Sequence, residues 1–285
     1  MLFLWIALGT LAALLLLYLI LLAPRTRRRA VEPFLRVPYA HRGLHGGGVP
    51  ENSLEAFRLA VENGYGIELD VQLSADGVVM VFHDESLLRM TGVDAPLWSK
   101  SAAELAALRL AGSDAHIPTL TEVLALVDGR VPLLVEIKSD HTPIAVCEKT
   151  AALLDAYAGP YMMESFHPLC VNWFRKNREG VVRGQLSSHL FAKGHRTPAR
   201  FVAQNLLLSI LARPDFIAFC YKDKKLLSFS LCRALYHPYT VAWTLREEEA
   251  LAASKEFDAV IFENIDKEAL CKAGRFKTDE KEEKQ

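Results

Sequence analysis

The chain begins with an unbroken hydrophobic segment before its pattern becomes alternating. The first 23 residues, MLFLWIALGTLAALLLLYLILLA, contain no charged side chain, and the first charged residue is Arg25. A helix of this length spans the hydrocarbon core of a bilayer, which is roughly 30 Å thick. The segment has no polar face, and it is longer than the helices that soluble proteins usually bury. We therefore expect a transmembrane helix over residues 1–23.

A cleaved signal peptide is the main alternative for this segment. Signal peptides begin with basic residues, have a shorter apolar core and end at a small-residue cleavage site, and the segment has none of these features. The sequence PRTRRR follows at 24–29, and an excess of Lys and Arg beside a span marks its cytoplasmic side. The pattern predicts a single-pass protein of the cell membrane whose main domain faces the cytoplasm.

From about Val37 onward, short apolar runs alternate with amphipathic stretches. This alternation predicts a parallel sheet with crossover helices. The length is close to the roughly 250 residues of a (β/α)₈ barrel, so we expect an α/β fold, a TIM (β/α)₈ barrel preceded by a single N-terminal transmembrane helix. An open doubly wound sheet is the alternative. Nine strands are expected, one more than the barrel needs, so one should be a paired or irregular piece: 37–40, 66–71, 78–83, 131–137, 161–166, 181–186, 215–219, 240–243 and 258–262.

Capping residues mark the ends of the clearest helices between these strands. In SLEAFRLAVENG, Ser53 is a suitable N-cap and Gly64 a stop. In TLTEVLALVDG, Thr119 is followed three residues later by Glu122, the spacing of a capping box. A third helix is expected over TLREEEALAASKEF, residues 244–257.

Residues 188–212 resemble an insertion between two barrel strands. Phe201, Leu206, Ile210 and Leu211 recur there at helical spacing, so the segment is expected to pack on the core or to lie on the membrane surface. The predicted organisation is a transmembrane anchor at 1–23, a basic juxtamembrane linker at 24–36, the barrel domain at 37–275 with its insertion at 188–212, and a charged disordered tail at 276–285.

Composition narrows the classes of partner. The 33 Lys and Arg residues nearly balance the 34 Asp and Glu residues, so there is no basic field of the kind that nonspecific nucleic-acid binding needs. The five cysteines form no CxxC pair and are odd in number, which argues against a disulfide framework or a cysteine zinc site. We expect no nucleic-acid partner, and the composition sets no oligomeric state.

Charged side chains gather at the predicted ends of strands. In a parallel barrel, the carboxyl ends of the strands face the active-site mouth. Glu68 and Asp70 are separated by two positions, as are Glu136 and Lys138, so each pair lies on one face of its strand. The residues expected at the ends of four successive strands are His41 and Arg42, Glu68 and Asp70, His83 and Asp84, and Glu136 and Lys138.

This combination of residue types suits metal-assisted phosphoester chemistry. Three carboxylates placed together repel one another unless a cation neutralises them, and an all-oxygen site suits a hard divalent ion. Two histidines beside that ion could act as general base and general acid. Arg42 and Lys138 could hold an anion, for which phosphate is the natural candidate.

The order of these motifs resembles the signature of the glycerophosphodiester phosphodiesterase family. The resemblance extends from Tyr39 to about Asn264. Its motifs are HRG (41–43), PENS (50–53), AF (56–57), ELDV (68–71), DG (76–77), HD (83–84), IPTLTEVL (117–124), EIK (136–138), SF (165–166) and AWT (242–244).

The resemblance implies hydrolysis of glycerophosphodiesters to glycerol 3-phosphate and an alcohol. One divalent ion, Ca²⁺ or Mg²⁺ with Mn²⁺ as a further candidate, would be its cofactor. The implied roles are acid–base catalysis by His41 and His83, metal binding by Glu68, Asp70 and Glu136, and substrate binding by Arg42, Glu51, Lys138 and Trp243. For Trp243, a place in the core is as good an expectation as one in the glycerol pocket.

Two other functions remain open at this point. The anchor and the 188–212 segment would also suit a lysophospholipase D acting on lysophospholipids at the membrane. A catalytically silent barrel could instead serve as a membrane-tethered binding protein, since a fold does not guarantee activity. That hypothesis predicts the loss of at least one ligand or acid–base residue, and the sequence shows none lost.

Overall fold

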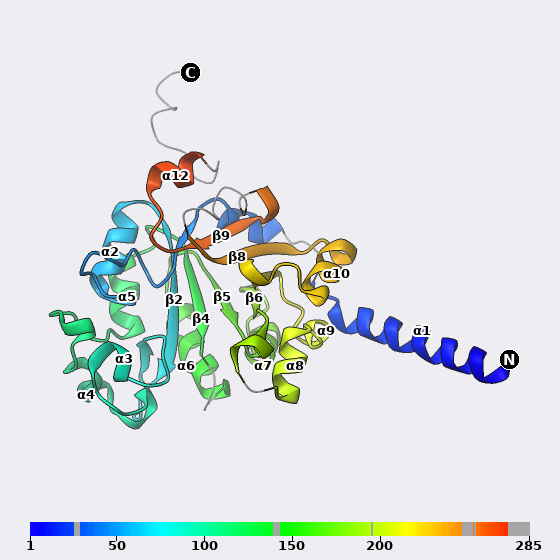
Figure 1. Ribbon diagram of the computed structural model, residues 1–285. Helices are drawn as coiled ribbons and strands as arrows, with labels where there is room; N and C mark the ends of the chain where they lie inside the picture. Colours follow the sequence, from blue (N-terminus) through cyan, green and yellow to red (C-terminus); the bar gives the residue numbers. More distant parts are fainter. Residues whose placement is uncertain (26–28, 139–142, 195, 247–252, 254, 273–285) are drawn as a thin grey trace, which may run out of the picture.

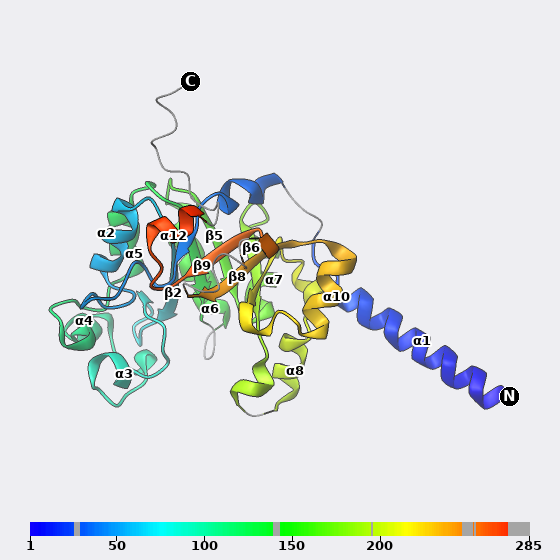
Figure 2. The same cartoon turned by 45° about the horizontal axis from the view of Figure 1, so that its top comes forward.

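Eight parallel strands close into a barrel (Figures 1 and 2) in the computed structural model, which describes residues 1–25, 29–138, 143–194, 196–246, 253 and 255–272. The first strand, β1, pairs with both β2 and β9, which closes the sheet and rules out an open doubly wound arrangement. The predicted TIM barrel is confirmed. Its strands are β1 Tyr39–Ala40, β2 Gly66–Leu73, β4 Leu133–Ile137, β5 Tyr161–Ser165, β6 Val182–Ser187, β7 Phe216–Cys220, β8 Tyr239–Leu245 and β9 Ala259–Phe262.

One of the nine predicted strands, that at 78–83, is not a barrel strand but pairs with the edge of another strand, as expected for one of the nine. Strand β3, Val79–Val81, runs antiparallel to β2, with Val81 opposite Val71. Only a short turn separates the two strands, and a parallel connection needs a dozen residues or more. The expectation that His83 ends a barrel strand is therefore wrong. The chain turns back after β2 and runs alongside it. Just after β3, Phe82 N–H donates to the carbonyl of Asp70 at 2.9 Å.

Helices cover the outside of the barrel. The cap predictions are confirmed, since the Ser53 hydroxyl accepts from Ala56 N–H and Thr119 forms a reciprocal capping box with Glu122. Half of the predicted helix at 244–257 lies outside the described residues, and its expected start is wrong, because Thr244 and Leu245 belong to strand β8, Tyr239–Leu245. The tail at 276–285 lies wholly outside the described residues. The longer helices of the body are α2 Leu54–Glu62, α5 Leu120–Val127, α6 Pro143–Asp155, α7 Pro168–Asn177, α10 Leu227–Tyr236 and α12 Lys267–Lys272, and the short helices α3 Leu88–Thr91 and α4 Ala102–Ala106 follow β3.

The inside of the barrel is apolar at one end and charged at the other. On β4 the inward residues are Leu134 and then Glu136, and on β5 they are Met162 and then Glu164. The 3₁₀ helix η1, Arg29–Leu35, covers the apolar end, where Tyr39 Oη donates to the carbonyl of Phe34 at 2.9 Å. The cavity inside the barrel lies at the charged end, where Glu136 and Glu164 line it.

Helix α1, Leu2–Leu22, projects from the barrel (Figure 1). Among the described residues it is the helix whose length and composition would allow it to cross a membrane. Its last turn is fixed to the body, because Leu22 is buried and Tyr236 Oη of α10 donates to the carbonyl of Leu19 at 2.6 Å. Helix α1 is thus joined to the barrel by packing as well as by the chain.

The 188–212 segment is not one continuous helix. It contains the 3₁₀ turn η4, Leu190–Lys193, and the short helices α8, Pro198–Gln204, and α9, Ser209–Ala212. The chain breaks between α8 and α9 at Leu206, whose φ of 55° lies in the left-handed region and whose side chain is buried. Burial of Leu206 therefore overrides the helical periodicity of the segment.

Substituting Gly184 should destabilise the barrel by overpacking. A Cβ at Gly184 would lie 2.2 Å from the buried ring of Phe216, whereas one at Gly180 would meet nothing within 4 Å. We expect Gly184→Ala to cost about 1–3 kcal/mol of unfolding free energy and Gly180→Ala to cost almost none. Thermal unfolding of the two variants of the full chain measures this, and equal melting temperatures would contradict it.

Candidate active site

Three buried carboxylates meet at the charged end of the barrel. Glu68 and Asp70 come from β2 and Glu136 from the neighbouring β4, where Asp70 and Glu136 are register partners. One oxygen from each residue lies within 4.8 Å of the others. These three residues, expected at the ends of neighbouring strands, thus lie close together at one end of the barrel.

Burial and neighbouring charges shift the pKa of each carboxyl group in this triad. Burial, followed by repulsion from Asp70 and Glu136, raises the pKa of Glu68 well above its usual value. Burial likewise raises the pKa of Glu136 to about 7. Burial also opposes ionisation of Asp70, but Lys138, His83 and Arg42 outweigh it and lower the pKa of Asp70. The protein's own cations therefore neutralise one carboxylate of the triad better than the other two.

Two cations lie against the triad. The ammonium of Lys138 is 3.0 Å from Asp70 Oδ1 and 2.6 Å from Glu136 Oε1. Arg42 Nε lies 3.6 Å from Asp70 Oδ2, and the backbone N–H of Arg42 donates to Glu68 Oε2 at 3.0 Å. Both predicted phosphate-binding residues therefore reach the site.

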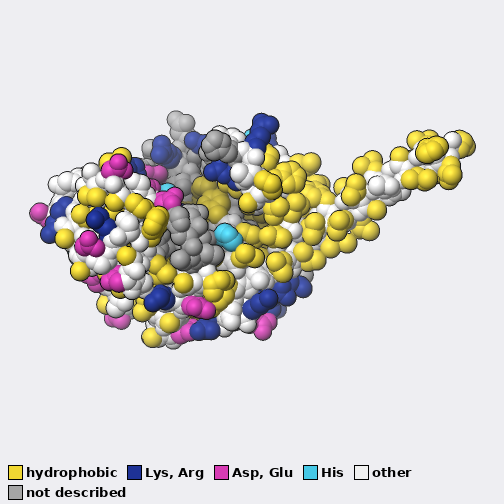
Figure 3. Space-filling view, turned by 90° about the horizontal axis from the view of Figure 1, so that it is seen from below, with side chains coloured by type: hydrophobic (Ala, Val, Ile, Leu, Met, Phe, Trp, Pro, Cys, Tyr) yellow, Lys and Arg dark blue, Asp and Glu magenta, His cyan; other side chains and the backbone are white. Residues whose placement is uncertain are grey.

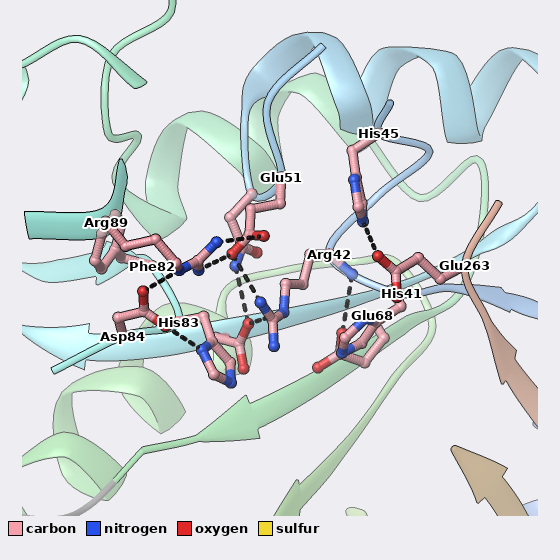
Figure 4. A network of polar contacts seen from close by, with 12 residues as sticks. His41, Arg42, His45, Glu51, Glu68, Phe82, His83, Asp84, Arg89 and Glu263 are labelled. Carbon is pink, nitrogen blue, oxygen red and sulfur yellow. Dashed lines mark hydrogen bonds and ion pairs between the residues drawn. The ribbon is translucent and has the colours of Figure 1, made fainter. Parts of the chain in front are cut away.

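Both predicted histidines line a small cavity of about 100 Å³ together with Glu68 and Glu136 of the triad. His41 Nε2 lies 4.0 Å from Glu68 Oε2. His83 Nδ1 lies 2.7 Å from Asp84 Oδ1 (Figure 4), which orients the ring. Burial lowers the pKa of His83 and that of His41, the latter to about 3. Burial of the two rings therefore disfavours their protonated forms.

A network around Glu51 connects the hairpin to the first strand (Figure 4). Arg89 of α3 bonds to Asp84 at 2.5 Å and to Glu51 Oε2 at 3.1 Å, and Arg42 donates to Glu51 Oε1 at 2.7 Å. The sequence predicted Glu51 at the mouth but gave no signal for Arg89, because this contact depends on how the loop after β3 folds. Arg89 holds Asp84, which in turn orients His83.

Three residues outside the predicted set of site residues also support the site. Asn52 Nδ2 donates to Asp70 Oδ2 at 2.9 Å. The amide of Gln72 donates to the carbonyls of Phe82 and Asp84 at 2.9 and 2.8 Å and so holds the chain around His83. Glu164 of β5 is buried, lines the cavity and is the register partner of Glu136. The strand-end rule could have identified Glu164, since it lies within the predicted strand at 161–166.

The composition of the site fits a hard divalent cation. Glu68, Asp70 and Glu136 offer oxygens within 4.8 Å of one another, and oxygens bound to one Ca²⁺ at about 2.3–2.6 Å lie no farther apart than about 5 Å. Glu164 adds a fourth buried carboxyl nearby, and burial with repulsion from Glu68 and Glu136 raises its pKa well above the usual value. The residues therefore fit a bound Ca²⁺ or Mg²⁺.

Comparison with known proteins agrees with this geometry. The model of the glycerophosphoryl diester phosphodiesterase family matches residues 41–267. The chain belongs to this family. It is 41% identical over 110 residues to a glycerophosphodiester phosphodiesterase of Caldanaerobacter subterraneus, a match covering 35% of this chain and 44% of that protein. It is 32% identical over 157 residues to a lysophospholipase D of Homo sapiens, covering 50% of this chain and 48% of that protein.

The chain spans less than half the length of these two relatives. Among solved structures, an Oleispira antarctica phosphodiesterase in complex with the product sn-glycerol-3-phosphate has the same fold. The TM-score is 0.67 at 24% sequence identity, with coverage of 81% of this chain and 94% of that one. The glycerophosphoryl diester phosphodiesterase fold thus extends over most of the described barrel.

In this member of the family, Trp243 lies at the cavity. Its side chain lines the same space as the histidines and meets the ring of Phe166 edge to face, with centroids 5.5 Å apart. Trp243 thus meets both expectations in part, because it packs against the core inside the barrel and also borders the cavity. The tryptophan and Phe166 form an apolar wall opposite charged groups, an arrangement that suits a carbon skeleton bearing a phosphate.

Divalent ions should stabilise the protein through the triad. An ion present at about 100 times its Kd stabilises the folded state by about 2.7 kcal/mol, so Ca²⁺, Mg²⁺ or Mn²⁺ should raise the melting temperature by several degrees. Glu68→Gln should lose this shift, whereas Glu148→Gln, at an exposed position of α6, should keep it. Thermal unfolding with each ion and with chelator measures this. No shift with any ion, or equal shifts in both variants, would contradict metal binding at the triad.

Proposed function

We propose that the protein hydrolyses glycerophosphodiesters to glycerol 3-phosphate and an alcohol. The observation that supports this best is the convergence of two histidines, an acidic triad and two cations on one small cavity. Family membership supports the same reaction class. All the predicted acid–base, metal-ligand and phosphate-binding residues are present, which favours an active enzyme over a silent scaffold.

The proposed cofactor is one divalent ion, Ca²⁺ or Mg²⁺, held by Glu68, Asp70 and Glu136. When bound, such an ion neutralises the carboxylates and polarises the phosphoryl group. Arg42 and Lys138 hold the phosphate oxygens by charge-assisted hydrogen bonds. The positive charge near those oxygens stabilises the additional negative charge that develops during transfer.

We assign orientation of the substrate's glycerol part to Glu51 and Trp243, at the rim of the cavity. Glu51 is held by Arg42 and Arg89, so its carboxylate is fixed for hydrogen bonds with the glycerol hydroxyls. Trp243 packs against the glycerol carbons. A fixed carboxylate and a rigid ring lose little entropy when the substrate binds.

The proposed reaction uses the two histidines in turn. One of His41 and His83 removes the proton from the glycerol hydroxyl next to the phosphate, and the alkoxide oxygen forms a bond to phosphorus. The other histidine protonates the leaving alcohol as its bond to phosphorus breaks. The histidine that gave up its proton then deprotonates a water molecule, whose oxygen forms a bond to phosphorus. The bond from phosphorus to the attacking glycerol oxygen breaks, the first histidine returns its proton to that oxygen, and glycerol 3-phosphate is released. Both rings recover their original protonation state.

We further propose that α1 anchors the enzyme in the cell membrane, with the barrel in the cytoplasm. The basic segment at 24–29 beside α1 supports this orientation. A reporter fused after Gln285 tests it. An enzyme such as β-galactosidase, which works only in the cytoplasm, should be active there, and activity only from a reporter that requires export would overturn the orientation.

Replacing either histidine should lower turnover by roughly 10²- to 10⁴-fold. The proton donor is needed less when the leaving group is acidic, so a p-nitrophenyl glycerophosphodiester should restore activity to the variant lacking the acid but not to the variant lacking the base. The turnover of each substrate is measured for His41→Ala and His83→Ala: glycerol 3-phosphate release from glycerophosphocholine, and p-nitrophenol release from the p-nitrophenyl diester. Retained turnover of glycerophosphocholine in either variant would remove that histidine from the mechanism.

Loss of Arg89 should act through His83. We expect Arg89→Ala to lower kcat by roughly tenfold or more, as removal of groups that orient catalytic ligands does. Arg58→Ala is the matched control, because Arg58 bonds Glu55 and Glu62 on the exposed side of α2. Adding Arg89→Ala to His83→Ala should cause little further loss. Fully additive effects on kcat would contradict the proposed role.

A further inference from the structure

An apolar groove of about 710 Å³ opens beside the catalytic cavity. One wall consists of Phe166, Pro168 and Leu169, where β5 passes into α7. The other wall comes from the 188–212 segment and includes Leu190, Val202 and Leu208. The volume is within the roughly 300–1,000 Å³ of ligand-binding clefts. The segment that lengthens the loop after β6 thus builds one side of a groove.

The groove is continuous with the reaction site at one end. Glu136 and Lys138, which belong to the candidate metal and phosphate sites, also line the groove, and Phe166 lines both spaces. A ligand lying along the groove would therefore present one end to the phosphate-binding cations. This continuity indicates a second part of the same substrate.

Polar groups in the wall at α7 are already satisfied by the backbone. Ser165 Oγ donates to the carbonyl of Ile137 at 2.7 Å and accepts from His167 N–H at 3.1 Å. His167 Nδ1 accepts from Leu169 N–H at 3.3 Å. What this wall offers a ligand is mainly apolar contact, which suits a hydrocarbon chain better than a sugar or a polar alcohol.

The groove lies on the side of the barrel where the anchor is attached. Helix α9 follows Leu208 directly and packs against α1. Phe201, Ile210 and Leu211 of the same segment expose large apolar surfaces. In Figure 3, hydrophobic side chains continue from α1 onto the adjoining part of the body. A ligand that enters from a bilayer would reach the groove along this surface.

We infer that the groove binds the acyl chain of a 1-acyl lysophospholipid whose phosphodiester occupies the catalytic cavity. This inference rests on the proposed hydrolysis of glycerophosphodiesters. The bond from phosphorus to the headgroup oxygen breaks, water supplies the new oxygen and a proton, and the products are an acylated glycerol 3-phosphate and the headgroup alcohol. A chain on the first carbon leaves the neighbouring hydroxyl free to attack. A diacyl phospholipid has that hydroxyl esterified and is not a substrate.

The test compares substrates that differ only in the chain. The full-length protein in phosphatidylcholine nanodiscs, with Ca²⁺ or Mg²⁺, is given glycerophosphocholine or 1-acyl lysophosphatidylcholines of increasing chain length below their micelle concentrations. Choline release is measured. Each methylene that enters the groove should raise kcat/KM roughly fourfold until the groove is filled, and the nanodisc phospholipid should release none.

A variant that narrows the groove makes the test specific. Ala199→Trp on the α8 wall should lower the ratio of kcat/KM for the long-chain lysophospholipid to that for glycerophosphocholine by roughly tenfold or more. Ala152→Trp, the same change at an exposed position of α6, should leave that ratio unchanged. A chain-length series together with this change of ratio supports the inference.

The negative outcomes separate the two proposals. Hydrolysis of glycerophosphocholine without hydrolysis of lysophospholipids overturns the inference and leaves the proposed function intact. A rate independent of chain length, an unchanged ratio in Ala199→Trp, or cleavage of the diacyl lipid also overturns it. If the unmodified protein cleaves neither substrate with any of the ions, the proposed function fails, and the inference fails with it.

Discussion

The arrangement of the site depends on burying carboxylates side by side on neighbouring strands. Glu68, Asp70 and Glu136 place oxygens within 4.8 Å of one another at the charged end of the barrel. Removing several like charges from water together is costly, and only cations at close range offset the cost. Lys138 supplies one such charge and Arg42 another. The remaining negative charge is of the kind that a bound divalent cation would neutralise.

Hydrogen bonds between neighbouring strands hold these carboxylates close together. The register of β2 and β4 sets Asp70 opposite Glu136, so the two carboxylates cannot separate without disrupting the sheet. The histidines are positioned differently, because His41 follows the short strand β1 and His83 follows a hairpin. Arg89, Asp84 and Gln72 compensate by fixing the hairpin from the outside. A site built on strands thus holds the charges, while a network between loops positions the acid–base groups.

Helix α1 and the 188–212 segment form the part of the molecule that departs from a minimal barrel. Helix α1 packs against α9 and is bonded to α10 through Tyr236. The same segment borders the apolar groove at Leu208. Packing from α1 through α9 therefore fixes α1 on the side of the barrel that carries the groove.

The sequence by itself determined the apolar helix, the alternation of strands and helices, the caps at Ser53 and Thr119, and the acidic triad. These follow from local periodicity, side-chain capping and the rule that strand ends meet at one mouth, all of which act over short stretches of chain. Tertiary structure decided that β3 turns back as a hairpin, that Leu206 breaks the insertion into two helices, and that Arg89 reaches Glu51. It also decided that a groove lies beside Glu136. These features depend on backbone angles in loops and on pairs of side chains far apart in sequence, and no local pattern specifies where such pairs meet.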